Sequence, residues 1–177
     1  DIKYFNTIDK AVAVGGTIMV NSFADPGEDW QMVNIDSTLG GPGGQYLNAI
    51  AYYNRQDASN PGAPLSAGYV AVGHTNYIFK SHSGTKWNED GTSLSFQVPQ
   101  SSLPSQALNK NFLGVAANND EIVVVGTEGL IIRATTLKSN SDSWTYVGVS
   151  TTEDFIDVVR TSNAFVAIST TGKTFTS

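Results

Sequence analysis

The sequence contains no cysteine among its 177 residues. This excludes a disulfide framework, a thiolate metal site and a cysteine nucleophile, and it leaves the redox compartment undetermined. Basic residues are also scarce, since ten Lys and Arg stand singly along the chain against sixteen acidic residues, for a net charge of −6. A phosphate-binding surface needs clustered positive charge, so we expect neither nucleic acid nor an anionic membrane surface as a partner.

Long apolar runs are missing too. The longest, residues 122–125, has the length of a strand, whereas a membrane-spanning helix requires roughly 18 residues. We therefore expect no membrane insertion, and no signal peptide is recognisable. The first residue is Asp1 instead of Met, which suggests an N-terminus that was processed, excised or left outside the sequence.

The chain is rich in glycine, with 17 residues, and in Ser, Thr and Asn, a composition typical of many short strands joined by turns. Four short apolar segments align on the residue that begins a turn, and the intervals between these residues are 58, 53 and 43. The three tryptophans are 57 residues apart. The aligned segments are residues 11–15, 70–73, 123–126 and 166–169.

Each of these segments lies between two others of strand length. The preceding ones are residues 2–6, 47–52, 112–116 and 155–159, and the following ones are 17–22, 77–81, 130–134 and 173–177. A fourth strand follows the tryptophan in the first three units. Each unit is therefore predicted to be a four-stranded antiparallel meander of about 45 residues, the size and strand count of a propeller blade.

The second strand of each unit is apolar on both faces, so both faces must be covered. Blades packed face to face provide that cover, and the small Ala49 and Gly114 suit a crowded position near a propeller axis. A two-sheet sandwich usually covers strands on one face and does not explain the repeat. We predict an all-β fold, a β-propeller with about three and three-quarter blades, at approximately residues 1–36, 46–98, 112–149 and 153–177.

The pattern of strand, Val-Ala-Val-Gly, turn, strand and Ser-x-Asp-Gly-x-x-Trp resembles the Asp-box (BNR-type) propeller repeats of sialidases, photosystem II assembly factors and many phage tail proteins. The resemblance covers most of the chain. The best copy of the box has Ser81, Ser83, Gly84 and Trp87, with Ser83 where the family has Asp. The first unit has Ser22, Asp25, Gly27 and Trp30 with two residues inserted, and the third keeps Trp144.

The box has a structural reason. A side-chain oxygen accepts hydrogen bonds from the turn, glycine takes the positive φ, and tryptophan is expected to be buried between blades. The fourth unit stops at Ser177, before its box. A ring of four to eight blades cannot close with this number, so we expect either a piece of a longer chain or a homo-oligomer that completes the propeller. Segments 36–45, 54–67 and 99–111 are expected to be surface loops.

In a propeller of this connectivity, the turns between second and third strands share a face with the links between blades. Ligands of the resembling families bind on that face near the axis. The resemblance therefore implies a ligand-binding rim, and the alternative is that its members are ordinary solvated turn residues. The rim would consist of His74, Asn76, Tyr77, Thr127 and Glu128.

Evidence for catalysis or metal binding is weak. The resemblance to sialidases implies an arginine triad, yet Arg55, Arg133 and Arg160 occupy different strand positions. His74 and His82 lie in turns on opposite predicted faces, which disfavours a metal site. The acidic clusters 25–29 and 118–121 are interpreted as turns instead of calcium loops, and no cofactor is expected.

The predicted function is a non-enzymatic structural or recognition module of a phage virion or other extracellular assembly. It would contact a receptor, a glycan or a neighbouring protein subunit, an expectation that rests on the resemblance. One alternative is a sialidase-like glycoside hydrolase whose catalytic groups lie partly outside this chain. Another is an assembly chaperone like the photosystem factors, which the acidic charge balance disfavours.

Overall fold

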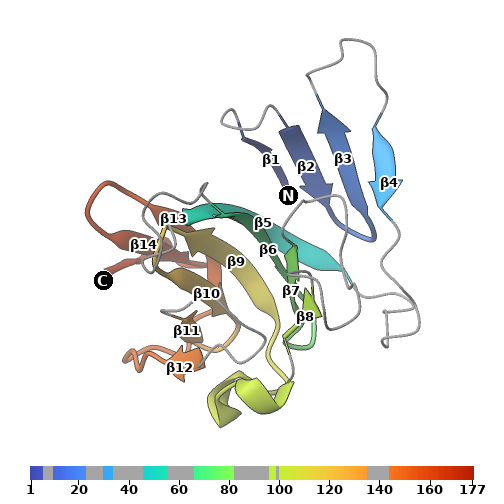
Figure 1. Ribbon diagram of the computed structural model, residues 1–177. Helices are drawn as coiled ribbons and strands as arrows, with labels where there is room; N and C mark the ends of the chain where they lie inside the picture. Colours follow the sequence, from blue (N-terminus) through green and yellow to red (C-terminus); the bar gives the residue numbers. More distant parts are fainter. Residues whose placement is uncertain are drawn as a thin grey trace.

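The computed structural model describes residues 1–5, 10–22, 30–33, 46–55, 66–81, 96–98, 100–134 and 144–177 (Figure 1). The described chain is all-β, and its strands form four antiparallel sheets in which consecutive strands are neighbours. No α-helix occurs in these ranges, and none of their helical turns is long and apolar enough to cross a membrane. A closed ring of sheets is not observed among the described strands.

Three sheets have four strands and the last has three. The first sheet contains β1 (Ile2–Phe5), β2 (Lys10–Val14), β3 (Ile18–Ser22) and β4 (Gln31–Val33). The second contains β5 (Leu47–Arg55), β6 (Ser66–Gly73), β7 (Ile78–Ser81) and β8 (Phe96–Gln97). The third contains β9 (Phe112–Ala117), β10 (Ile122–Gly126), β11 (Ile131–Ala134) and β12 (Trp144–Tyr146), and the fourth β13 (Phe155–Arg160), β14 (Phe165–Ser169) and β15 (Thr174–Thr176).

The second strands β6 and β10 are apolar on both faces because each contributes to two cores. In β10, Ile122 and Val124 enter the core shared with the second sheet, while Val123 and Val125 enter the core shared with the fourth. Since successive side chains of a strand point to opposite faces, a continuous apolar run is what such a strand requires. The expectation that both faces are covered is confirmed for β10. In β14 one face is open, with Ile168 37% exposed.

The first strands β1, β5, β9 and β13 contact one another in succession toward the middle of the molecule (Figure 1). The side-chain amide of Asn48 in β5 donates to the Phe112 carbonyl oxygen of β9 over 2.7 Å. A groove of about 210 Å³ is lined by residues of all four strands, from Lys3 of β1 to Arg160 of β13. The approach is close at Gly114, where an added Cβ would lie 2.9 Å from the Asp157 Cα.

A β-bulge recurs at the second residue of the first strand in three sheets. The extra residues are Asn48, Leu113 and Ile156, each opposite the point where the second strand ends. A bulge bends a strand and increases its twist. Its repetition at one position is therefore expected to bend the three first strands in the same way. The sequence pattern does not reveal these bulges.

The tryptophans have different environments. Trp144 is 5% exposed and belongs to the core between the second and third sheets, as expected. Trp30 is 37% exposed, so its predicted burial is wrong. It precedes β4 on the face of the first sheet opposite Val12 and Val20, and no sheet covers that face among the described residues.

Other box and loop predictions have mixed outcomes. Ser81 is fully buried at the end of β7, and Ser22 ends β3. The predicted loop 54–67 is shorter than expected, because β5 runs to Arg55 and β6 begins at Ser66. Asp25, Gly27, Ser83, Gly84, Trp87 and segment 36–45 lie outside the described residues.

The link 99–111 is not simply a surface loop. It contains two short 3-10 helices, Gln100–Ser102 and Ser105–Ala107. Leu103 and Ala107 are buried in the core between the second and third sheets. A link with apolar side chains at this spacing closes one end of that core. The segment is rich in polar residues and proline, so the sequence pattern indicated a surface loop and not a contribution to the core.

Replacing Gly114 by valine should destabilise the protein, because the added side chain meets the backbone of β13 and the side chain of Val125. We expect the free energy of unfolding to fall by about 1–3 kcal/mol, measured by urea denaturation. Gly15→Ala is the matched control: nothing lies within 4 Å of its Cβ position, and its effect should stay within about 0.5 kcal/mol. Equal effects of the two substitutions would show that the β9–β13 approach is not tightly packed.

Candidate functional site at the turns between second and third strands

Three turns connect second to third strands with the same two backbone hydrogen bonds. Each spans five residues, 73–77, 126–130 and 169–173, and its first N–H donates to the carbonyl oxygen of its fifth residue over 2.9–3.1 Å. The second N–H donates to the carbonyl oxygen of the residue before the first strand of the same sheet. These second bonds run from His74 to Tyr46, from Thr127 to Asn111 and from Thr170 to Asp154.

Two of these turns also bind the link that enters the next sheet. The Thr75 N–H donates to the side-chain oxygen of Asn111 at 3.0 Å, and the Asn76 N–H donates to the Lys110 carbonyl oxygen at 2.8 Å. The following turn repeats both bonds one sheet later. There the Glu128 N–H donates to Asp154 Oδ1 at 2.8 Å and the Gly129 N–H to the Glu153 carbonyl oxygen at 2.9 Å.

The contact between each of these two turns and the link to the next sheet requires left-handed backbone in the turn. The φ values are 56° at both Thr75 and Asn76, 57° at Glu128 and 72° at Gly129. Non-glycine residues with positive φ are uncommon and cost on the order of 1 kcal/mol. The conformation aims two successive N–H groups at one link, and their hydrogen bonds offset that cost. We call the surface made by these turns and links the turn face.

The expected rim residues divide between the surface and the interior. His74 is exposed, and the Glu128 side chain is exposed and forms an ion pair with Lys110. Asn76 is 3% exposed, so its side chain does not lie on the surface, and it occupies the position of Gly129 because asparagine tolerates positive φ. Tyr77 and Thr127 are both half-buried.

The two half-buried residues have structural contacts. The Tyr77 ring stacks on Phe79 with centroids 5.8 Å apart and packs against the core between the first and second sheets. The Thr127 hydroxyl accepts the Asn111 N–H over 3.2 Å. Because Asn111 also binds Thr75, the turns of the second and third sheets lie against the same link.

The sequence interpretation missed Tyr46, which is 58% exposed beside the turn of its own sheet. Its ring meets the His74 ring edge to face, with centroids 6.1 Å apart. Two aromatic side chains thus lie together on the turn face. Aligning the residues that precede each first strand (Tyr46, Asn111 and Asp154) would have revealed the position.

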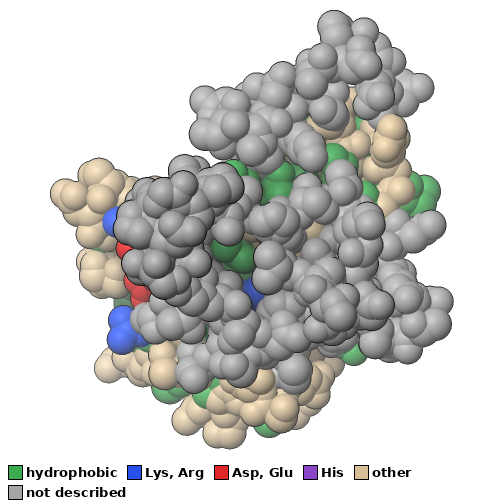
Figure 2. Space-filling view, viewed as in Figure 1, with side chains coloured by type: hydrophobic (Ala, Val, Ile, Leu, Met, Phe, Trp, Pro, Cys, Tyr) green, Lys and Arg blue, Asp and Glu red, His purple; other side chains and the backbone are tan. Residues whose placement is uncertain are grey.

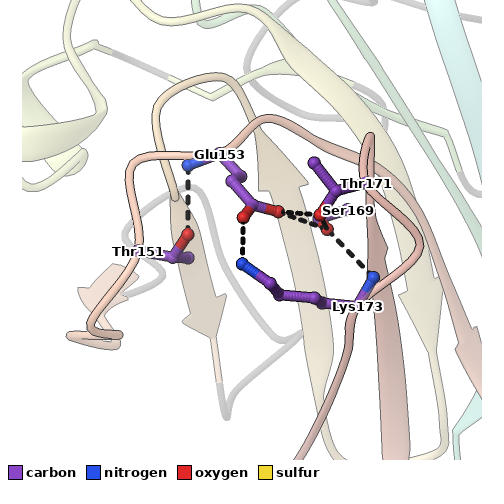
Figure 3. A network of polar contacts seen from close by, with 5 residues as sticks. All are labelled: Thr151, Glu153, Ser169, Thr171 and Lys173. Atoms are coloured by element: carbon purple, nitrogen blue, oxygen red, sulfur yellow. Dashed lines mark hydrogen bonds and ion pairs between the residues drawn. The ribbon is translucent and has the colours of Figure 1, made fainter.

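A network of polar contacts holds the fourth sheet's turn to its link (Figure 3). One oxygen of the Glu153 carboxylate accepts the Ser169 hydroxyl at 2.7 Å and the Thr171 hydroxyl at 2.5 Å. The other oxygen pairs with the Lys173 ammonium. The Glu153 N–H donates to the Thr151 hydroxyl oxygen at 3.1 Å.

These contacts change the acidity of Glu153. The hydrogen bond from Lys173 is the largest cause, and those from Thr171 and Ser169 add to it. Together they lower the pKa of the Glu153 carboxyl to about 2. All three donors bind the ionised form, so the carboxylate acts as an acceptor that closes the turn and not as a general base.

Other candidate groups are engaged locally. Arg133 pairs with Glu121 of its own sheet at 3.6 Å, and the Arg160 guanidinium lies 5.1 Å from the Phe165 ring centroid. The Asn118 side chain accepts the N–H groups of Asp120 and Glu121, both at 2.8 Å, which confirms a turn at 118–121. His82, Arg55's side chain and cluster 25–29 lie outside the described part, within which no three metal-binding side chains gather. Figure 2 shows charges of both signs side by side along the left edge of the view, where the fourth sheet lies.

Comparison of the chain with protein-family models finds no match, and comparison with curated protein sequences finds no significant relative.

Replacing Asp154 by alanine removes the side-chain acceptor of the Glu128 N–H. We expect faster hydrogen exchange at the Glu128 amide and a loss of about 1 kcal/mol of unfolding free energy. Asp154→Asn keeps an acceptor oxygen, as Asn111 does at the equivalent position, and should behave nearly as the parent protein. Exchange rates that do not separate the two variants would contradict the proposed role of this contact.

Stability should depend on pH through Glu153. Its pKa falls from about 4.5 to about 2 on folding, so its contribution is present above the higher value and is lost as pH drops toward the lower one. Glu153→Gln lacks this titration. The difference in Tm between the parent protein and the variant should therefore shrink between about pH 5 and about pH 2. A Tm difference that stays constant over this range would count against the network.

Proposed function

We propose that the four sheets are blades of a β-propeller and that the chain is a non-enzymatic recognition module of a larger extracellular or virion assembly. The observation that supports this most is the repeated junction of the turn face. Turn and link are bonded in the same way at successive sheets, from Thr75 with Asn111 to Glu128 with Asp154. Such repetition would turn each sheet by a similar amount relative to the last, as a propeller requires.

The terminal sheets support an assembly of several copies. The outward face of the first sheet carries the exposed Ile2 and Met32, and that of the fourth carries the exposed Val159 and Ile168. Figure 2 shows hydrophobic side chains at the surface near β4. Exposed apolar side chains at both ends favour packing of one end on the other, which would complete a ring. Sedimentation equilibrium measures the mass of the assembly and tests this arrangement.

The turn face supports recognition. Its junctions hold the backbone rigidly, which lowers the entropic cost of binding. Tyr46 and His74 display aromatic rings there, and Lys110 and Glu128 add charges of both signs. Tyrosine is enriched at binding surfaces because it combines a large apolar ring with a hydroxyl group. A glycan is the partner that best suits exposed rings beside hydrogen-bonding groups.

Binding to a panel of immobilised oligosaccharides, measured by surface plasmon resonance, tests this role. Tyr46→Ala and His74→Ala should each weaken binding by about tenfold, because each removes a ring from the turn face. Tyr146→Ala is the matched control, since Tyr146 is an exposed tyrosine of the outer strand β12. Binding that survives both substitutions would exclude the turn face, and cleavage of any panel member would favour a hydrolase.

A further inference from the structure

The groove between the first strands, of about 210 Å³, is lined by equivalent positions of all four sheets. In each sheet, one lining residue pairs with the residue that lies three positions before the turn at the end of the second strand. These four lining residues are Lys3, Ala51, Ala116 and Val159. The groove therefore belongs to the repeated architecture, and we call it the first-strand groove.

The two inner sheets supply most of the wall of the first-strand groove. Both of these sheets are packed against a neighbouring sheet on each face. Space remains between their first strands because three of the lining side chains are alanine methyl groups. The groove is thus present within the inner sheets and does not arise at the outer face of the first or the fourth sheet. The residues that line it from the inner sheets are Ile50, Ala51 and Tyr52 of β5 and Val115, Ala116 and Ala117 of β9.

Two basic residues from distant parts of the chain meet at this groove. Lys3 lies in β1 and Arg160 at the end of β13, and both line the groove. Basic residues are scarce in this chain, which has ten of them and a net charge of −6. Among the described residues that line the groove, none is acidic. Two cations beside apolar walls indicate a ligand that combines a negative charge with an apolar body.

The Arg160 guanidinium is held in place by its own surroundings. Its two terminal nitrogens donate to the carbonyl oxygens of Thr161 at 2.5 Å and Ser162 at 3.3 Å, and it lies 5.1 Å from the Phe165 ring centroid. These bonds use two of its five N–H groups. Because both acceptors are neutral carbonyl groups, the positive charge is retained for a ligand, and a fixed side chain lowers the entropic cost of binding.

Lys3 has a weaker attachment. Its ammonium lies 3.7 Å from Asp1 Oδ2, and 45% of the Lys3 side chain is exposed. The Asp1 carboxylate is itself bound by two backbone groups, since it accepts the N–H of Ile2 at 2.9 Å and of Ile50 at 3.3 Å. Lys3 can therefore turn to a ligand while Asp1 keeps its other partners. Asp1 is the acidic group that competes with a ligand for this ammonium.

We propose that the first-strand groove binds a small organic carboxylate. The carboxylate lies between Lys3 and Arg160, and its apolar body packs on the alanines of β5 and β9 beside the Tyr52 ring. The volume is below the range of drug-sized pockets, about 300–1,000 Å³, so the body is limited to a single ring or a short branched chain. One carboxylate matches two cations, whereas a polyphosphate requires a larger basic cluster.

This site is separate from the turn face. β9 and β13 begin at the turn face, directly after Asn111 and Asp154, and their lining residues belong to the later part of each strand. The proposal therefore does not depend on the recognition role of Tyr46 and His74. A carboxylate that binds here leaves the two junctions intact.

Benzoate is the probe, and two-dimensional amide NMR of the isotope-labelled 177-residue protein is the measurement. Titration should produce saturable shifts at the amides of Ala116, Ala117 and Arg160, which line the groove. Benzamide has the same ring without the charge and should bind at least about tenfold more weakly. Added salt should weaken the binding of benzoate, because it screens the two exposed cations.

Charge variants test the two cations separately. Arg160→Gln should weaken benzoate binding about tenfold and Lys3→Gln about threefold, because the Lys3 ammonium is more mobile and already paired. Asp1→Asn should strengthen binding about twofold, since it removes the competing carboxylate. Arg133→Gln is the matched control, because Arg133 is an exposed basic residue of β11 outside the groove, and its affinity should equal that of the parent protein.

A further variant tests the apolar part of the site without a change of charge. Ala117→Leu places a larger side chain at a half-buried position of the groove and should weaken benzoate binding at least about tenfold. The amide spectrum of each variant shows whether it is folded. Lys3→Gln decides the role of charge if Arg160→Gln does not fold.

Several results would overturn the proposal. One is the absence of saturable shifts at the lining amides, and another is a set of shifts confined to the turn face. Equal affinities for benzoate and benzamide would show that charge is not recognised. Unchanged affinity in folded Arg160→Gln and Lys3→Gln variants would also contradict the assignment.

Discussion

The arrangement of sheets depends on one hydrogen-bonded junction, in which a turn of one sheet donates two N–H groups to the link that enters the next. Asn111 and Asp154 supply the side-chain oxygens of the two junctions, and the carbonyl groups of Lys110 and Glu153 supply the second acceptors. The side-chain acceptors belong to the residues directly before a first strand and the carbonyl acceptors to the residues one position earlier, so the junction fixes where that strand starts. Packing alone is tolerant of small rotations, whereas paired hydrogen bonds are directional.

The cores between sheets complement these junctions. Every inner sheet contributes one face to each of two cores, which is why residues 69–72 of β6 and 122–125 of β10 are apolar. The first strands approach closely where residues are small, as at Gly114. Hydrogen bonds at one end of the sheets and close packing along the first strands thus act on different parts of the same interface. Both features agree with the propeller that we propose, and the proposed recognition role uses the surface formed by the junctions.

Much of the fold was predictable from the sequence because periodicity reports burial directly. The apolar runs ending at Gly73 and Gly126 gave β6 and β10, and their two-sided apolarity gave the neighbouring sheets. The site was less predictable. Asn76 is a polar turn residue of the kind that often binds ligands, but it is buried, and asparagine suits this position because it tolerates positive φ. Tyr46 precedes its strand, outside the apolar pattern, and is exposed beside His74. Trp30 and Trp144 belong to the same regular series of tryptophans, yet Trp30 is exposed and Trp144 is buried. Which of them is buried depends on whether another sheet packs against it, and the residues around each tryptophan in the sequence do not show this.

The positions of the donors and acceptors of the junction within each unit limit how the number of units in such a chain can change. A unit carries its acceptors before its first strand and its donors after its second, as the third sheet does with Asn111 and Glu128. Duplication of a whole unit therefore regenerates a complete junction on either side of the copy. Insertion of one strand does not, because it separates donors from acceptors and reverses the direction of the chain. Arrays of these sheets can consequently change length only in whole units, with each new unit compatible with any neighbour of the same kind.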